Sequence, residues 1–184
     1  MNNYFHTGIS KPYLMKYFLV LVISVSFISA KAQTQGYDSI PPFQKDSMLP
    51  VFSIMQTDSS WFNNLDLPKN KPVVILYFSP ECGHCQLTAH DYMKDMKRFK
   101  EVFFVWVSYQ PMDEIKTFAD NYKMLKAKNI AIGRDPKYYV PSFFRVKYTP
   151  FIAVYNKDGK LLQAFDGGTD ADTLYNLLFP AENR

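Results

Sequence analysis

The sequence predicts an α/β fold with a central, mostly parallel sheet and helices on both faces. The segments PVVILYF (72–78) and VFFVWVSY (102–109) are apolar without alternation and rich in β-branched and aromatic residues. Strands that are buried on both faces have this composition. The segment between them, residues 85–100, is typical of a helix, whose apolar face would be formed by Leu87, Met93, Met96 and Phe99. Two parallel strands joined by a helix form a right-handed βαβ unit.

A C-terminal antiparallel hairpin is also indicated. The apolar segments FIAVY (151–155) and LLQAF (161–165) flank NKDG, in which Asp-Gly favours a tight hairpin turn. Thr169 and Asp172 approximate a capping box for a last helix that ends near Phe179. The remaining expected elements are a short strand at 51–54, a loop with one helical turn at 59–71, a helix at 112–125, a strand at 129–133 and a short helix at 138–146.

Residues 1–32 have the pattern of a secretory signal peptide. Lys11 and Lys16 precede the uncharged stretch Tyr17–Ser29, and Ala-Lys-Ala follows before Gln33. The stretch has 13 residues, whereas a membrane-spanning helix needs about 20, so cleavage is favoured over a membrane anchor. A start at Met15 would make this signal more compact.

The rest of the chain divides into two parts. Residues 33–50 are polar and contain proline, so we expect a flexible leader there. The folded domain is predicted to cover residues 51–184. With 47% apolar residues, the chain has enough hydrophobic side chains to fill a core.

The charge of the chain argues against nucleic acid as a partner. Cleavage after residue 32 would remove three of the 21 basic residues and none of the 17 acidic ones, which leaves 18 against 17. The sequence also contains no basic stripe with interleaved aromatic residues. Membrane contact is expected only through the signal segment, if it is not cleaved.

The two cysteines of the chain, Cys82 and Cys85, lie in SPECGHCQ between a predicted buried strand and a predicted helix. The unpaired amides and the dipole of a helix N-terminus stabilise a thiolate, so Cys82 would be the reactive nucleophile. Cys85, one turn deeper, would attack the mixed disulfide that forms on Cys82. Gly83 would permit the tight turn, and His84 would add positive charge beside Cys82.

Other uses of the two cysteines are weaker. A disulfide across so short a loop gains little from loop closure, which argues against a purely structural bond. A structural zinc site needs four ligands, commonly in two separated pairs, whereas His84 and His90 are the only further ligands nearby and no second pair exists. Haem attachment requires C-x-x-C-H, but Gln86 follows the second cysteine. We expect no metal and no organic cofactor.

Two longer segments resemble a known family. KPVVILYFSPECGHC (71–85) and YTPFIAVYNKDGKL (148–161) are similar to segments of the exported TlpA-like thiol-disulfide oxidoreductases, which have a thioredoxin-like fold. The resemblance implies a cis peptide bond at Thr149-Pro150 that faces the C-x-x-C motif. It also implies that Thr149 offers backbone hydrogen bonds to an extended substrate segment. We expect Gly83, His84, Thr149 and Pro150 to form the substrate-binding surface.

The chain departs from the family in three ways. Glu81 replaces the usual tryptophan before the first cysteine, and its negative charge would raise the pKa of the neighbouring thiol. Leu76 replaces the buried acid that handles the proton of the second cysteine, so Glu81 or His84 is a candidate for that proton transfer. The Gly-His dipeptide between the cysteines resembles that of disulfide isomerases and indicates a more oxidising pair.

Together these features predict an exported thiol-disulfide oxidoreductase of the periplasm or cell envelope. It would act as a monomeric reductase, exchange its dithiol with protein thiols and disulfides, and receive electrons from another redox protein, with a membrane protein as one candidate. Two alternatives stay open. One is a disulfide isomerase or oxidant, and the other is a noncatalytic binding module with the same fold.

Overall fold

The computed structural model describes residues 39–180. The predicted signal peptide, the alternative start at Met15 and the first part of the predicted leader, residues 33–38, lie outside the described residues. Within residues 39–180, no helix is both long and apolar enough to cross a bilayer.

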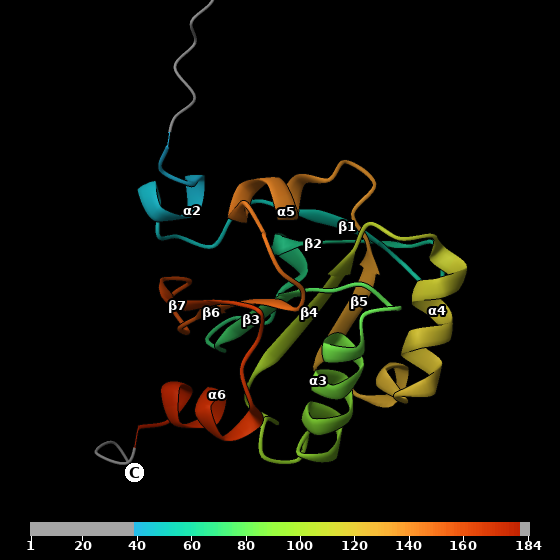
Figure 1. Ribbon diagram of the computed structural model, residues 1–184. Helices are drawn as coiled ribbons and strands as arrows, with labels where there is room; N and C mark the ends of the chain where they lie inside the picture. The colour runs from blue at the N-terminus through green and yellow to red at the C-terminus, as the bar shows by residue number, and fades with distance from the viewer. Residues whose placement is uncertain (1–38, 181–184) are drawn as a thin grey trace, which may run out of the picture. The chain divides into compact units, whose positions relative to one another are not determined.

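A mixed sheet forms the centre of the described domain (Figure 1), with the strand order β2-β1-β5-β4-β3-β6-β7. The strands are β1 (Ser53–Gln56), β2 (Trp61–Asn63), β3 (Val73–Tyr77), β4 (Phe103–Ser108), β5 (Ile130–Arg134), β6 (Phe151–Tyr155) and β7 (Leu161–Asp166). Parallel pairing joins β3 to β4 and β4 to β5, and the other neighbours pair antiparallel. The three parallel strands therefore end together, at what we call the carboxyl edge.

Helices cover both faces of this sheet. They are α2 (Pro42–Lys45), α3 (Gly83–Lys94), α4 (Met112–Asn121), α5 (Tyr139–Phe144) and α6 (Ala171–Leu178), with 3₁₀ turns η2 (Asn64–Asp66) and η3 (Met124–Lys126). Alternate residues of β3 point to opposite faces, as strand geometry requires. Leu76 packs in a cluster with residues of α3, α4 and α6, whereas Ile75 packs with residues of α2 and α5. The predicted α/β fold with helices on both faces is confirmed.

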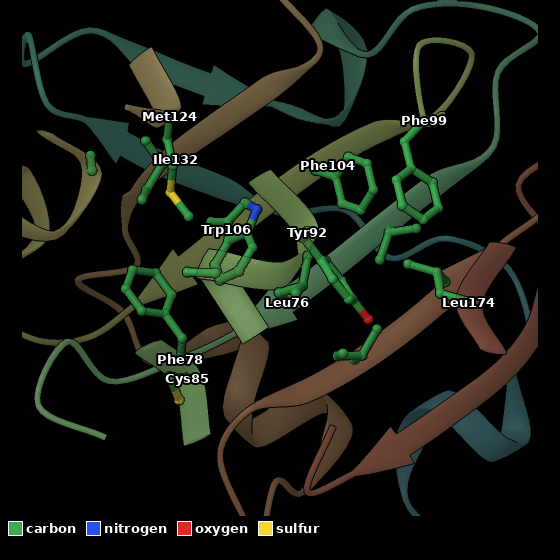
Figure 2. Close-up of a cluster of buried hydrophobic side chains, with 14 of the residues drawn as sticks. Leu76, Phe78, Cys85, Tyr92, Phe99, Phe104, Trp106, Met124, Ile132 and Leu174 are labelled. Atoms are coloured by element: carbon green, nitrogen blue, oxygen red, sulfur yellow. The ribbon is translucent and has the colours of Figure 1, made fainter. Parts of the chain in front are cut away.

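The cluster under α3, α4 and α6 is rich in aromatic side chains. Figure 2 shows Trp106 and Tyr92 within it and Cys85 near Phe78 at one end. The Phe78 ring lies edge-on to Trp106, with centroids 5.6 Å apart, which is a favourable aromatic geometry. Cys85 is completely buried in this cluster, so the packing of α3 fixes the position of the second cysteine.

One strand pairing was missing from the sequence-based prediction. The region expected to be a loop with a helical turn contains the helical turn as η2, but also the edge strand β2, which pairs antiparallel with β1. This hairpin extends the sheet beyond β5 on the side away from the C-terminal hairpin. Its three residues, Trp61–Asn63, are too few to produce a recognisable alternation.

The predicted apolar face of α3 was partly wrong. Leu87 is 59% exposed, whereas the buried residues of the helix are Cys85, Ala89 and Tyr92. These three also have helical spacing, and the helix turns this stripe inward. Because α3 ends at Lys94, the buried Phe99 belongs to the turns that follow it.

The packed part of the chain begins before Val51, where the sequence predicted the end of a flexible leader. Phe43 of α2 is buried and its ring centroid lies 5.5 Å from that of Phe144. The Leu49 amide donates a hydrogen bond of 2.8 Å to the Gly159 carbonyl. The second half of the predicted leader therefore packs against the domain through an apolar anchor in a polar segment.

The start of α6 also differs from the prediction. Asp170, and not Thr169, is the N-cap residue, and its carboxylate accepts a hydrogen bond from the Thr173 amide. Asp172 instead pairs with Arg98 at 2.7 Å. The cap motif therefore lies one residue later than the sequence indicated.

Candidate functional site

Cys82 is placed by the loop that leaves β3 at the carboxyl edge. The Phe78 amide donates a hydrogen bond of 2.9 Å to the Val107 carbonyl of β4. The Cys82 amide donates one of 3.1 Å to the Ser79 carbonyl, which forms a turn. Cys82 is the N-cap residue of α3, and its own carbonyl accepts the first helical hydrogen bond, from Gln86. The Cys82 side chain therefore lies where the helix amides have no backbone partners.

The segment before β6 lies directly opposite this cysteine. The Thr149-Pro150 peptide bond is cis, as the family resemblance implies. The Cys82 sulfur lies 3.4 Å from the Thr149 carbonyl oxygen, which accepts a hydrogen bond from the thiol. The structure therefore brings together the two sequence motifs that carried the resemblance, although 67 positions separate them.

Asp166 and Gly168, which were not predicted as site residues, determine how the segment before β6 packs. The Tyr148 amide donates a hydrogen bond of 2.9 Å to the Asp166 carboxylate. A Cβ atom added at Gly168 would lie 2.9 Å from Cγ of Pro150, so a larger residue would displace the proline ring. The Gly-Gly pair before the last helix was the available signal for this close approach.

The environment of Cys82 favours its thiolate. Partial burial raises the pKa of this thiol, but hydrogen bonds to the sulfur outweigh that effect and lower the pKa below its ordinary value. The donors are the Thr149 hydroxyl, the Cys85 thiol and the backbone amides of Cys85 and His84. His84 thus contributes through its backbone. A lowered thiol pKa increases the fraction of the nucleophilic form at neutral pH.

Cys85 has the opposite environment. Burial raises its pKa to about 12, and the hydrogen bond that it shares with Cys82 acts in the same direction. The position that holds a buried acid in the family is occupied by Leu76, which is fully buried in the same cluster as Cys85. At neutral pH the pair therefore consists of one activated thiol and one protonated thiol, and both are free in this structure.

The other predicted site residues lie on the surface. Glu81, Gly83 and His84 are exposed, and among the described residues neither Glu81 nor His84 has a side-chain hydrogen bond to a cysteine. Gly83 is the first residue of α3 and does not have a positive φ, so the turn does not require glycine. An added Cβ at Gly83 would meet no atom within 4 Å. The surface at Gly83, next to Cys82 in the chain, is therefore unobstructed.

The residues considered for a metal do not converge. Across the part of the chain that the structure describes, no three histidine, cysteine or acidic side chains form a group that could hold a metal ion. His90 is exposed and its Nδ1 lies 3.0 Å from the Asp91 carboxylate.

The difference between the two thiols predicts selective alkylation. When the reduced protein is treated with a limited amount of iodoacetamide near neutral pH, we expect Cys82 to be modified and Cys85 to be spared. The rate should reach half of its plateau at a pH below the ordinary pKa of a thiol, because hydrogen bonds to the sulfur let the Cys82 thiolate form at lower pH. Peptide mapping by mass spectrometry measures both the site and the rate. Equal modification of both cysteines would contradict the assigned environments.

Comparison with known proteins gives the family. A sequence profile of the thioredoxin-like domain matches residues 67–181, which include the C-x-x-C motif and the cis-proline segment. The chain belongs to the thioredoxin-like family. A search of curated proteins finds no match.

Solved structures of other thioredoxin-like proteins share the fold. A secreted disulfide oxidoreductase of Mycobacterium tuberculosis, homologous to Escherichia coli DsbE, superimposes with a TM-score of 0.58 at 20% identity, over 68% of this chain and 92% of that one. DsbF of the same organism superimposes with a TM-score of 0.59 at 24% identity, over 68% of this chain and 91% of DsbF. The peroxidoxin BcpB of M. tuberculosis superimposes with a TM-score of 0.61 at 17% identity, over 71% of this chain and 92% of BcpB. These likenesses establish the fold of this thioredoxin-like chain.

Proposed function

We propose that this chain is an exported thiol-disulfide oxidoreductase that reduces disulfides of protein substrates with the Cys82-Cys85 pair. One observation carries the proposal. An N-cap cysteine with a lowered pKa lies 3.4 Å from the carbonyl that precedes a cis proline, with a buried, protonated cysteine one helical turn deeper. This arrangement provides a nucleophile, a resolving thiol and a backbone acceptor for a bound segment.

The reaction takes place in two exchanges. The Cys82 thiolate attacks one sulfur of the substrate disulfide, which breaks that bond and releases the other sulfur as a thiolate that takes up a proton. Cys85 then loses its proton and attacks the Cys82 sulfur of the mixed disulfide, which releases the second substrate thiol. The substrate gains two electrons and two protons, and the protein becomes the Cys82-Cys85 disulfide.

The residues around the pair have separate roles in this proposal. Thr149 and Pro150 position an extended substrate segment, and the exposed surface of Gly83 and His84 leaves room for it beside Cys82. Glu81 and His84 remain the candidates for exchanging protons between the site and solvent. A second dithiol protein, for which we propose a membrane protein, returns the electrons.

Export is proposed on the pattern of residues 1–32 and on the secreted oxidoreductase among the structural neighbours. Extracytoplasmic compartments tolerate disulfides, so a protein that exchanges them is expected to work there. We propose a monomer in the periplasm or cell envelope.

An oxidant or isomerase is the second candidate. Lowering the pKa of Cys82 stabilises the reduced form of the pair, and a stabilised reduced form makes a dithiol more oxidising. The Gly-His dipeptide favours the same direction.

The reduction potential separates the two candidates. The purified chain would be equilibrated across glutathione redox buffers, and the fraction of Cys82-Cys85 disulfide measured by mass spectrometry after acid quenching and alkylation. A reductase is expected near the thioredoxin value of about −270 mV, and an oxidant or isomerase between about −180 and −120 mV. If the pair never cycles, the enzyme proposal fails and a noncatalytic thioredoxin-fold module takes its place.

A further inference from the structure

We propose that a groove at the carboxyl edge of the sheet binds an extended, cysteine-containing segment of a partner protein, with an aromatic side chain in the groove and a carboxylate beside it. This inference rests on the proposed function. It concerns how the substrate is held at positions away from its reacting cysteine.

The groove has a volume of about 840 Å³ and is lined from three directions. Its walls come from the start of β1, from the β2–η2 segment and from the turn between β5 and α5. Leu65 is 87% exposed there and Trp61 is 54% exposed. Large apolar side chains that are exposed together on a groove mark binding surfaces.

Aromatic contacts connect this groove to the end of β3, the strand that precedes the Cys82 loop. Tyr138 lines the groove, and its ring centroid lies 6.4 Å from that of Tyr77, the last residue of β3. The Tyr138 ring also lies 5.1 Å from Tyr109, directly after β4. Tyr109 and Tyr138 are both partly exposed. A continuous aromatic surface therefore joins the end of β3 to the groove.

The sheet itself sets the length of segment that would reach the groove. β5, β1 and β2 lie two, three and four strands from β3. At about 4.8 Å per strand, the groove covers about 10 to 19 Å from the end of β3. An extended chain, at about 3.3 Å per residue, crosses that distance in about three to six residues. The aromatic residue should therefore lie about three to six residues from the substrate cysteine.

The charges of the groove indicate a carboxylate beside the aromatic side chain of the bound segment. Asp135 is 1% exposed, and its carboxylate accepts hydrogen bonds from the Val140 and Lys137 amides at 2.7 and 3.1 Å. The Lys137 side chain, in contrast, is exposed and lines the groove. The accessible charge of the lining is thus positive, and it complements a carboxylate next to the aromatic anchor.

Synthetic peptides test the proposal directly. Each peptide has one cysteine, joined to glutathione by a disulfide, and one phenylalanine at a spacing of one to nine residues on either side. The reduced full chain is mixed with each peptide, and the released glutathione is measured against time. We expect the rate constant to be about tenfold higher for spacings of three to six residues on one side than for peptides without phenylalanine. A glutamate beside the phenylalanine should raise the rate further than a lysine there.

Two variants remove the proposed contacts, and two matched variants act as controls. Leu65→Ser should abolish the advantage of the phenylalanine, and Lys137→Glu should reverse the preference for glutamate over lysine. Leu125→Ser and Lys126→Glu make the same changes at exposed positions of η3, which precedes β5 at the opposite edge of the sheet. These two controls should behave as the unaltered chain. Oxidised glutathione, which is too small to reach the groove, should react equally with all five proteins.

The outcomes separate the two proposals. If oxidised glutathione reacts but the peptide rates do not depend on phenylalanine, or if Leu65→Ser and Leu125→Ser behave alike, the groove proposal fails and the proposed function stands. Loss of self-association in Leu65→Ser without a change in peptide rates would instead make the groove a contact between copies, which also overturns the proposal. If neither the peptides nor oxidised glutathione react with the unaltered chain, the proposed function itself fails.

Discussion

Replacement of Cys82 by serine is expected to lower the rate of protein disulfide reduction by more than about a thousandfold. A serine hydroxyl stays protonated at neutral pH and cannot form a disulfide, so the first exchange has no nucleophile. The buried Cys85, with a pKa of about 12, cannot replace Cys82. The rate would be followed through precipitation of the reduced chains of insulin, with dithiothreitol as electron donor.

The Cys82→Ser protein must be shown to be folded. Cys82 is only partly buried and ends the loop before α3, so the circular dichroism spectrum and the melting temperature should change little. Ser79→Ala, a small change in the same loop, provides a matched control that should keep most of the activity. If folded Cys82→Ser reduced insulin at the rate of the unaltered chain, the assigned nucleophile would be wrong.

Replacement of Cys85 by serine is expected to stop the reaction after its first step. Cys82 would still attack, but no thiol would remain one turn deeper to release the substrate. The product should be a stable mixed disulfide of about one substrate molecule per chain, while multiple turnovers are lost. Non-reducing electrophoresis and mass spectrometry would detect this species.

Because Cys85 is completely buried among apolar side chains, we expect a serine hydroxyl there to lower the stability of the domain. Cys85→Ala avoids the buried hydroxyl and should accumulate the same mixed disulfide. The double variant with Cys82→Ser should accumulate none. If Cys85→Ser and Cys85→Ala both fold and neither accumulates a mixed disulfide with the substrate, Cys85 is not the resolving thiol.

The sequence predicted best the elements whose local pattern determines their structure. The uninterrupted apolar segments became β3 and β4, and the C-x-x-C motif lies at the junction of strand and helix because β3 ends five residues before Cys82. The cis peptide at Thr149-Pro150 followed from the resemblance to a family. Each of these features depends on a short segment or on a known motif.

Features that depend on tertiary contacts were not predicted. Leu87 and Ala89 belong to the same helix, and only its packing on the sheet shows that Ala89 faces inward while Leu87 is exposed. Phe43 is an apolar residue in a largely polar segment, and its burial depends on Phe144 and Phe151, which lie far along the chain. Such partners have no signature in a local pattern.

Tertiary contacts also determine the parts of the candidate site that the sequence did not predict. Both cysteines were identified from their spacing, but the opposite pKa shifts of the two thiols depend on where α3 buries Cys85. The tyrosines that lead to the groove come from the end of β3 and from the segments that follow β4 and β5. The strand order of the sheet brings these tyrosines together. No local sequence pattern specifies that order.

The central claim, that Cys82 attacks and Cys85 resolves, is tested most directly by following the bonds in time. The reduced, unaltered chain would be mixed with one equivalent of a disulfide-bonded protein, quenched with acid at increasing times and mapped by mass spectrometry. We predict that substrate first appears linked to Cys82, and that this species decays into a chain with a Cys82-Cys85 disulfide, lighter by two hydrogen atoms. Substrate linked to Cys85, or a chain whose cysteines stay reduced throughout, would contradict the account.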